Sequence, residues 1–105
     1  MMGTASYYGV ECCKFNPHNG CPMANGQSLY EAIKDGVRYA AMWDVPFGTR
    51  LKVTGLASGK STEVIVSDRG PAHRLNRLID LNPHSFSEIC EKKDGLCEVS
   101  LEVLS

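Results

Sequence analysis

Two stretches with an apolar–polar alternation, separated by a glycine-containing connection, lie at the centre of this sequence. Their apolar members are spaced two residues apart: Leu51, Val53, Val64 and Val66. Because successive side chains of a β-strand point to opposite faces, this spacing predicts strands over residues 50–54 and 61–67 that share one buried face. A similar alternation predicts a last strand over residues 98–104. Any fold of this chain must enclose these side chains within a sheet or a barrel.

Further strands are predicted on either side of this hairpin, at residues 4–10, 37–42 and 78–81. Several short strands with only two brief helices predict a mainly β fold, in the form of a closed six-stranded barrel. The 105 residues suit one domain, residues 1–105, and are too few for two.

The two helices are predicted from their first residues. Ser28, with a glutamate three residues later, forms a capping box that begins a helix over residues 29–35. The apolar stripe of this helix is Leu29, Ala32 and Ile33. Asn82, followed by a proline, caps a second helix that runs to about Glu91.

Charge and hydropathy exclude several classes of protein. The formal net charge is -1, so no basic field favours nucleic acid and no nucleic-acid partner is expected. No run of about 18 apolar residues is present, so no transmembrane segment is expected. The first residues lack the basic start and apolar stretch of a signal peptide. Either the protein is cytosolic or a targeting segment has been removed.

Five cysteines are a high count for so short a chain. Cys90 and Cys97 flank a turn-rich segment and can close a small disulfide loop, and Cys21 can pair with Cys12 or Cys13. Two disulfides would imply an oxidising compartment. Reduced structural thiols, or a metal cluster that also includes the nearby histidine at position 18, are the alternatives. No Cys-x-x-Cys pair is present, so we expect no metal site.

Residues 55–61, Gly-Leu-Ala-Ser-Gly-Lys-Ser, superficially resemble a phosphate-binding loop. That motif needs four residues between its glycines, with a strand before it and a long helix after it. Here three residues separate the glycines and alternating strands flank the segment. We therefore interpret it as a hairpin turn and expect no cofactor.

The segment from Val66 to Pro71 carries the strongest functional signal. Asp68 follows an apolar strand, and Gly70 with the next proline turns the backbone sharply. This places Asp68 at a barrel rim, where its side chain can meet a ligand. A turn-capping aspartate is the common alternative for such a position.

Five short motifs occur in order along the chain. They are Gly-Thr-Ala-Ser-Tyr-Tyr-Gly at 3–9, Ala-Asn-Gly at 24–26, Pro-Phe-Gly-Thr at 46–49, Ser-Asp-Arg-Gly-Pro at 67–71 and Ile-Asp-Leu at 79–81. On these motifs, which cover nearly the whole chain, the sequence resembles the rare lipoprotein A (RlpA-like) family of double-psi β-barrels. Expansins and the barrel domains of some lytic transglycosylases are similar more distantly.

The resemblance implies a periplasmic, outer-membrane-anchored or secreted protein. Its implied partner is the glycan strand of peptidoglycan, which active members of the family cleave. It also implies that Asp68 is the catalytic acid. Two positions depart from the family pattern: Gln27 stands where glutamate is usual and Met42 where histidine is usual. The helix over residues 29–35 looks like a short insertion beside the same rim.

Substrate-binding residues are expected around this rim. The candidates are Tyr8, Gln27, Met42, Trp43, Asp44, Arg69 and His73. Trp43 is either a packing residue or a sugar platform, Asp44 is a candidate second carboxylate, and Asp80 is expected to be structural. The basic stretch that contains Arg69 and His73 is either a solvated face or a contact for substrate carboxylates.

Two functions remain open at this point. One is an endolytic transglycosylase in which Asp68 alone protonates the leaving oxygen and then accepts the proton of the sugar's own 6-hydroxyl. The other is a wall-binding, expansin-like module without turnover, which the loss of proton-trading groups at Gln27 and Met42 favours. In either case we expect a monomer.

Overall fold

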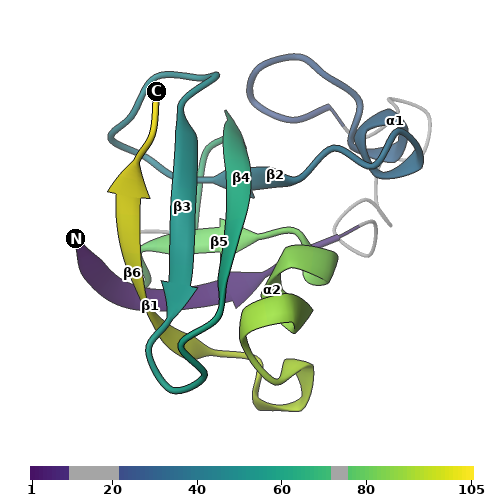
Figure 1. Ribbon diagram of the computed structural model, residues 1–105. Helices are drawn as coiled ribbons and strands as arrows, with labels where there is room; N and C mark the ends of the chain where they lie inside the picture. The colour runs from purple at the N-terminus through teal and green to yellow at the C-terminus, as the bar shows by residue number, and fades with distance from the viewer. Residues whose placement is uncertain (10–21, 72–75) are drawn as a thin grey trace.

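The computed structural model describes residues 1–9, 22–71 and 76–105. In it, the two central alternating stretches form an antiparallel hairpin of β3 (Arg50–Gly55) and β4 (Ser61–Asp68). The remaining strands are β1 (Met2–Tyr7), β2 (Tyr39–Ala41), β5 (Ile79–Leu81) and β6 (Cys97–Val103). They close into a barrel in the order β1-β5-β2-β4-β3-β6 (Figure 1). Two of the pairings, β1 with β5 and β2 with β4, are parallel. The predicted six-stranded double-psi barrel is confirmed.

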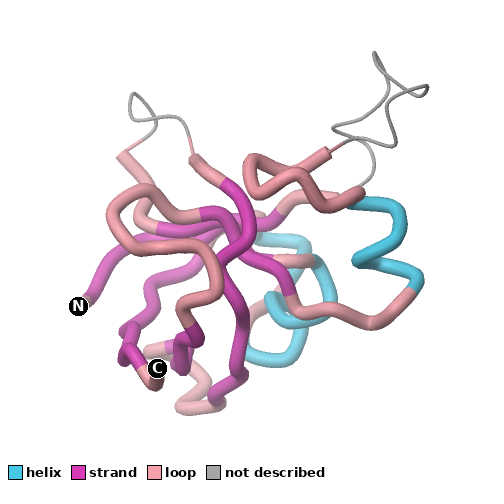
Figure 2. Tube along the Cα trace, turned by 90° about the horizontal axis from the view of Figure 1, so that it is seen from above, coloured by secondary structure: helices cyan, strands magenta, loops and turns pink. Residues whose placement is uncertain are grey.

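Two helices lie on one side of the barrel, and the two chain ends lie on the other (Figures 1 and 2). In α1 (Leu29–Lys34) the Ser28 hydroxyl accepts a hydrogen bond from the Glu31 N–H, as the capping box predicts. In α2 (Pro83–Ile89) the Asn82 side chain caps the first turn. Among the described residues, no helix is long and apolar enough to cross a membrane.

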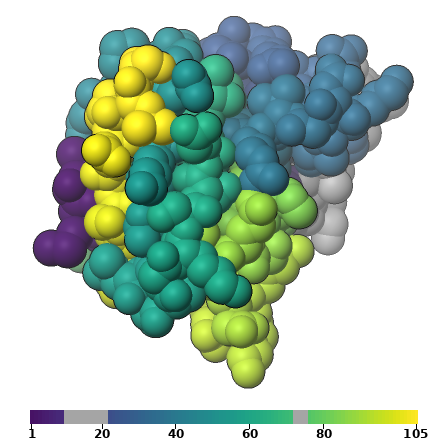
Figure 3. Space-filling model, viewed as in Figure 1, coloured from purple at the N-terminus to yellow at the C-terminus, as the bar shows by residue number. Residues whose placement is uncertain are grey.

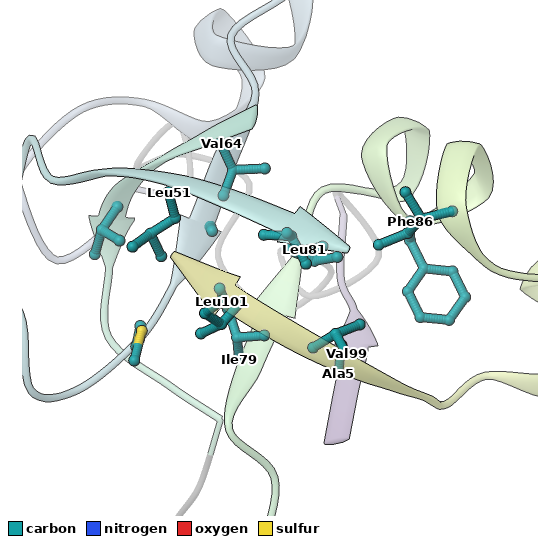
Figure 4. Close-up of a cluster of buried hydrophobic side chains, with 13 residues drawn as sticks. Ala5, Leu51, Val64, Ile79, Leu81, Phe86, Val99 and Leu101 are labelled. Atoms are coloured by element: carbon teal, nitrogen blue, oxygen red, sulfur yellow. The ribbon is translucent and has the colours of Figure 1, made fainter. Parts of the chain in front are cut away.

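The barrel interior is filled by the side chains that the alternation predicts. Figure 4 shows Leu51, Val64, Val99 and Leu101 meeting Ile79 and Leu81 inside the barrel, with Phe86 of α2 closing one end. All are buried. A second, smaller cluster joins α1 to the barrel through Met23, Leu29, Ala32 and Tyr39.

Two apolar side chains that continue a predicted apolar pattern are nevertheless exposed, each for a local reason. Ile33 is 43% exposed, because the two-turn α1 packs only Leu29 and Ala32 inward. Val103 is 62% exposed, because it ends β6 beyond the filled part of the barrel.

Several predicted boundaries also move. β1 covers Met2–Tyr7 rather than starting at Thr4, and the predicted end of this strand at Val10 lies outside the described residues. β2 is reduced to Tyr39–Ala41, because the N–H of Val37 still bonds to α1 at Ala32. The second helix ends at Ile89.

Cys90 and Cys97 form the predicted disulfide, which closes the segment that carries a 3-10 turn at Lys92–Asp94. The other predicted pair, Cys21 with Cys12 or Cys13, lies outside the described residues.

Candidate active site

Asp68 is the last residue of β4, where the sequence predicts that the strand gives way to a turn. Gly70 follows with a φ of 151°, a value that residues with a Cβ rarely adopt. The glycine therefore lets the backbone turn sharply directly after β4.

The Asp68 carboxylate accepts three hydrogen bonds. The hydroxyl of Tyr8 donates to one oxygen at 2.9 Å, and the N–H groups of Ala24 and Arg69 donate to the other, each at 2.8 Å. These donors come from the residue after β1, from the loop before α1 and from the residue after β4. The carboxylate thus ties three separate segments together, which goes beyond a local turn cap.

Asp80 of β5 lies beside Asp68 because of the way β2 is paired. Ala41 is the register partner of Asp68 on one side and of Asp80 on the other. Register partners point to the same face, and neighbouring strands lie about 4.8 Å apart, so the two Cα atoms are about 10 Å apart. The small Ala41 side chain between them leaves the space between the carboxylates open.

A register shift between β2 and β4 orients the Asp68 side chain toward this space. Ala40 pairs with Val66, but Ala41 pairs with Asp68, so Ser67 is skipped. A bulge of this kind re-aims the following side chain. Ser67 stays on the outer face, where its hydroxyl contacts the Met23 sulfur, and Asp68 joins Ala41 and Asp80.

A cleft of about 220 Å³ opens at this point. Its lining residues are Tyr8, Pro22, Met23, Leu29, Ala41, Asp68, Arg69 and Asp80. The cleft therefore places two carboxylates among apolar side chains, and one tyrosine and one arginine complete its lining.

The electrostatics of the cleft raise the pKa of the Asp80 carboxyl above its ordinary value. Burial raises the pKa of the Asp80 carboxyl, and the charge of Asp68 raises it further, although the Ser6 hydroxyl and the Arg77 charge act in the opposite direction. The Ser6 hydroxyl donates to Asp80 across the pairing of β1 with β5. Burial and the neighbouring Asp68 also raise the pKa of Tyr8 above its ordinary value, so this phenol stays a neutral donor.

Two of the predicted substrate-binding residues line the cleft, in roles that differ from the expected ones. The sequence predicts that Tyr8 binds substrate, but its ring packs edge-on against Tyr39 and its hydroxyl donates to Asp68. Arg69 donates to the carbonyls of Met42 and Val45, each at 2.8 Å, and its guanidinium lies 4.0 Å from the centre of the Phe47 ring. Arg69 therefore fixes the loop between β2 and β3 at the cleft's edge.

The other predicted residues lie around the cleft or away from it. Met42 is buried in the barrel interior, so it does not face substrate as expected. Gln27 is half-buried in the turn whose Ala24 holds Asp68, and Asp44 is exposed between β2 and β3. Trp43 is 39% exposed, and its indole N–H donates to the carbonyl of Pro71 at 2.6 Å. His73 lies outside the described residues.

Asp80 is the cleft residue whose position sequence reasoning missed. It was assigned a structural role, yet its neighbours Ile79 and Leu81 are both buried, so the alternation of β5 alone turns Asp80 outward. Its proximity to Asp68 depends on the strand order of the closed barrel. Among the described residues, no group of three or more His, Cys, Asp or Glu side chains could hold a metal ion.

The chain is similar to several known proteins in sequence. No protein-family model matches the chain. An uncharacterized protein of Synechocystis sp. is 37% identical over 101 residues, which cover 96% of each chain. A probable endolytic peptidoglycan transglycosylase RlpA of Nostoc sp. is 35% identical over 98% of this chain and 25% of its own length. The endolytic peptidoglycan transglycosylase RlpA of Rickettsia bellii is 34% identical over 97% of this chain and 41% of its own length. The chain thus spans less than half of these two RlpA proteins.

Solved structures share the fold at low sequence identity. An expansin variant of Clavibacter michiganensis, in complex with cellohexaose, superimposes with a TM-score of 0.70 at 19% identity, over 100% of this chain and 51% of its own. Cerato-platanin 3 of M. perniciosa gives a TM-score of 0.68 at 13% identity, over 100% of this chain and 95% of its own. At these identities the likeness concerns the barrel alone.

Proposed function

Because this chain belongs to the rare lipoprotein A (RlpA-like) family, we propose that it is a peptidoglycan-acting domain that cleaves glycan strands by lytic transglycosylation. The observation that carries the proposal is the pair Asp68 and Asp80, which face one cleft from either side of Ala41. The relatives named transglycosylases match nearly the whole chain, which supports the same class of substrate here.

The reaction needs one proton donor and one proton acceptor. The donor protonates the glycosidic oxygen as its bond to the sugar C1 breaks. The oxygen of the same sugar's 6-hydroxyl then bonds to C1, and its proton passes to the acceptor. The product carries a 1,6-anhydro ring, no water is consumed, and the enzyme regains its starting state when the proton returns to the donor.

The surroundings of the two carboxylates suggest which is the proton donor and which is the proton acceptor. Asp80, whose pKa is raised by burial and by Asp68, suits the donor. Asp68 accepts hydrogen bonds from three donors, so it suits the role of proton acceptor. Its negative charge would also stabilise a cationic sugar in the transition state. This pair extends the single-residue scheme expected from sequence, in which Asp68 performs both steps.

Residues at the edge of the cleft would hold the glycan. Trp43 offers part of an indole face while its N–H is tied to Pro71, so the ring orientation is fixed. Phe47 is 41% exposed and lies under the Arg69 guanidinium. Exposed, oriented aromatic rings suit the apolar faces of sugars.

A second candidate function is wall binding without turnover, in the manner of an expansin-like module. The position where the family usually has histidine is Met42, which is buried, and Gln27 cannot trade protons. Both changes remove proton-transfer groups while leaving the aromatic edge of the cleft in place.

We also propose that the protein acts outside the cytoplasm. The Cys90–Cys97 disulfide supports this location, because such bridges persist mainly in oxidising compartments. Peptidoglycan as the substrate supports the same location.

The decisive experiment is digestion of purified peptidoglycan, followed by analysis of the released fragments for anhydro-sugar ends. Wild-type protein should release them, and Asp68→Asn and Asp80→Asn should each lower the rate by roughly 10²-fold or more. Asp94→Asn, which changes an exposed carboxylate in the 3-10 turn, is the matched control and should keep full activity.

Binding to insoluble peptidoglycan and thermal melting, measured on the same proteins, separate the two functions. A wild-type protein that binds the wall but releases no anhydro ends supports the binding module. Full activity in a folded Asp68→Asn protein would remove Asp68 from the mechanism.

A further inference from the structure

The segment between β2 and β3, residues 42–49, carries two exposed aromatic side chains, and we call it the aromatic loop. Trp43 is 39% exposed and Phe47 is 41% exposed. Neither of them lines the cleft that contains Asp68 and Asp80. Figures 1 and 3 show this dark teal segment at the top of the molecule, next to the yellow end of the chain. The two rings therefore suit sugar units that extend beyond the cleft.

The ends of the aromatic loop are fixed to β4 by backbone hydrogen bonds. The N–H of Met42 donates to the carbonyl of Asp68 at 3.2 Å, and the N–H of Gly48 donates to the carbonyl of Val66 at 2.8 Å. Within the loop, the Val45 side chain packs against the barrel core. These contacts anchor the loop backbone, so replacing one side chain outside the loop should not unfold it.

Arg69 is the cleft residue that connects the cleft with the two rings. Its Nη1 donates to the carbonyls of Met42 and Val45, which lie on either side of Trp43 in the sequence, each at 2.8 Å. Its guanidinium carbon lies 4.0 Å from the centre of the Phe47 ring, which is a cation–π contact. The Arg69 side chain thus fixes the backbone around one ring and covers the other.

The backbone of Arg69 contacts the carboxylate to which we assign the proton acceptor role. Its N–H donates to Asp68 at 2.8 Å, and a substitution of the side chain leaves this bond in place. In the described part of the chain, Arg69 forms no ion pair with a carboxylate. The indole N–H of Trp43 donates to the carbonyl of Pro71, which adds a second link between the same two segments.

From this geometry we propose that Arg69 is a positioning residue, whose guanidinium holds Trp43 and Phe47 as an outer binding site for a long glycan strand. Aromatic rings suit the apolar faces of sugars, and a ring that is already oriented loses little conformational freedom on binding. The inference rests on the proposed function. It adds that the affinity for long strands depends on Arg69, which acts through the rings and takes no part in proton transfer.

The test measures the cleavage of short and long peptide-free glycan fragments. Wild-type protein should have a lower KM for the long fragments. Arg69→Gln should raise this KM about three- to tenfold, as expected for a weakened ring contact, with little change in kcat or in the KM for short fragments. Arg50→Gln removes an exposed arginine of β3 and is the matched control, which should keep the wild-type preference for long fragments.

Two further variants test the route through the rings. Arg69→Lys keeps the charge, but an ammonium lacks the planar group that donates to two carbonyls and stacks on a ring, so this variant should behave like Arg69→Gln. In a Phe47→Leu background, Arg69→Gln should have a smaller effect than in wild type, because both changes act on one ring. All rates are referred to the folded fraction, which thermal melting of each variant gives.

Three results would overturn the inference while leaving the proposed cleavage intact. An equal rise of KM for short and long fragments, or a fall of kcat alone, would place the action of Arg69 inside the cleft. A wild-type length preference in Arg69→Lys would mean that positive charge is sufficient. Additive effects of Arg69→Gln and Phe47→Leu would mean that Arg69 contacts the sugar directly.

A wild-type protein that binds the fragments but releases no anhydro ends would overturn the proposed cleavage alone. The same comparison is then made with dissociation constants in place of KM. Loss of the preference for long fragments in Arg69→Gln would support the outer binding site, and its retention would overturn it. Absence of binding to both lengths would overturn the proposed function and the outer binding site together.

Discussion

The strands β4 and β5 each contribute to two regions that are stabilised differently. Val66, Ile79 and Leu81 fill the barrel interior, where stability comes from apolar burial. Asp68 and Asp80, in the same two strands, face the cleft and are held by hydrogen bonds from Tyr8, Ser6 and backbone N–H groups. A rigid interior thus fixes the positions of two carboxylates, and substitutions in the two regions should have separable effects.

The largest expected effect on stability comes from the interior. Leu51 is 1% exposed in β3, and Leu51→Ala should lower the free energy of unfolding by about 2–5 kcal/mol through lost burial and a residual cavity. Urea denaturation measures this loss. Leu56→Ala, at a half-exposed turn position, is the control and should change stability by less than about 0.5 kcal/mol.

The cleavage activity of Leu51→Ala also tests whether the barrel interior and the cleft are independent. The fraction of Leu51→Ala that remains folded should cleave peptidoglycan at the wild-type rate, because the cleft carboxylates keep their strands. A specific activity that falls well below the folded fraction would mean that interior and cleft are not separable.

The interior is also the part of the molecule that the sequence predicts best. An alternation such as Leu51–Val53 or Val64–Val66 is a local pattern with one physical cause, and all four residues are buried as expected. Asp68 could be placed at the rim in the same way, from the strand before it and the Gly70 turn after it.

What the sequence does not predict depends on contacts between distant segments. Asp80 meets Asp68 only because Ala41 pairs with both, and that pairing needs the closed strand order and a register shift. The resemblance predicts Met42 at the cleft, because it stands where the family usually has histidine, but its side chain packs in the interior. Ile33 follows the helical stripe, yet α1 is too short to bury it.

The next prediction concerns the hydrogen bond that joins the cleft to β1. Tyr8→Phe removes the hydroxyl that donates to Asp68 at 2.9 Å and leaves the ring contact with Tyr39. Stability should fall by about 1–2 kcal/mol, since this bond has a charged acceptor, and the cleavage rate should fall roughly tenfold. Tyr30→Phe, at an exposed position of α1, is the matched control for both readouts. Wild-type activity in Tyr8→Phe would mean that Asp68 needs no help from β1.

A smaller effect is expected at Met42, which tests the boundary between the two regions. Met42→Leu conserves volume, so it should cost less than about 1.5 kcal/mol and leave cleavage unchanged. Met42→Ala should cost about 2 kcal/mol or more. If Met42→Leu instead lowered cleavage without changing stability, Met42 would belong to the cleft, as the sequence suggests.

The smallest expected effect is a pH dependence of stability that originates at Asp80. Its pKa is raised in the folded protein, chiefly by burial, so the folded state holds this proton more tightly than the unfolded chain does. The stability that Asp80 contributes is therefore fully present below the ordinary aspartate pKa of about 3.9 and is lost as pH rises through the raised value. Asp80→Asn has no proton to lose, so its melting temperature should rise relative to wild type between about pH 3 and pH 7.

Glu88 provides the control of opposite sign for this measurement. Its hydrogen bond with Arg38 lowers the pKa of the Glu88 carboxyl, so its contribution is present above the ordinary glutamate pKa and is lost as pH falls. Glu88→Gln should therefore lose melting temperature relative to wild type as pH rises over the same range, where Asp80→Asn gains it. Because both side chains lie partly at the surface, added salt should shrink the Glu88 difference. Parallel pH curves for wild type and Asp80→Asn would show that Asp80 does not hold a proton in the folded cleft, and the donor role would then return to Asp68.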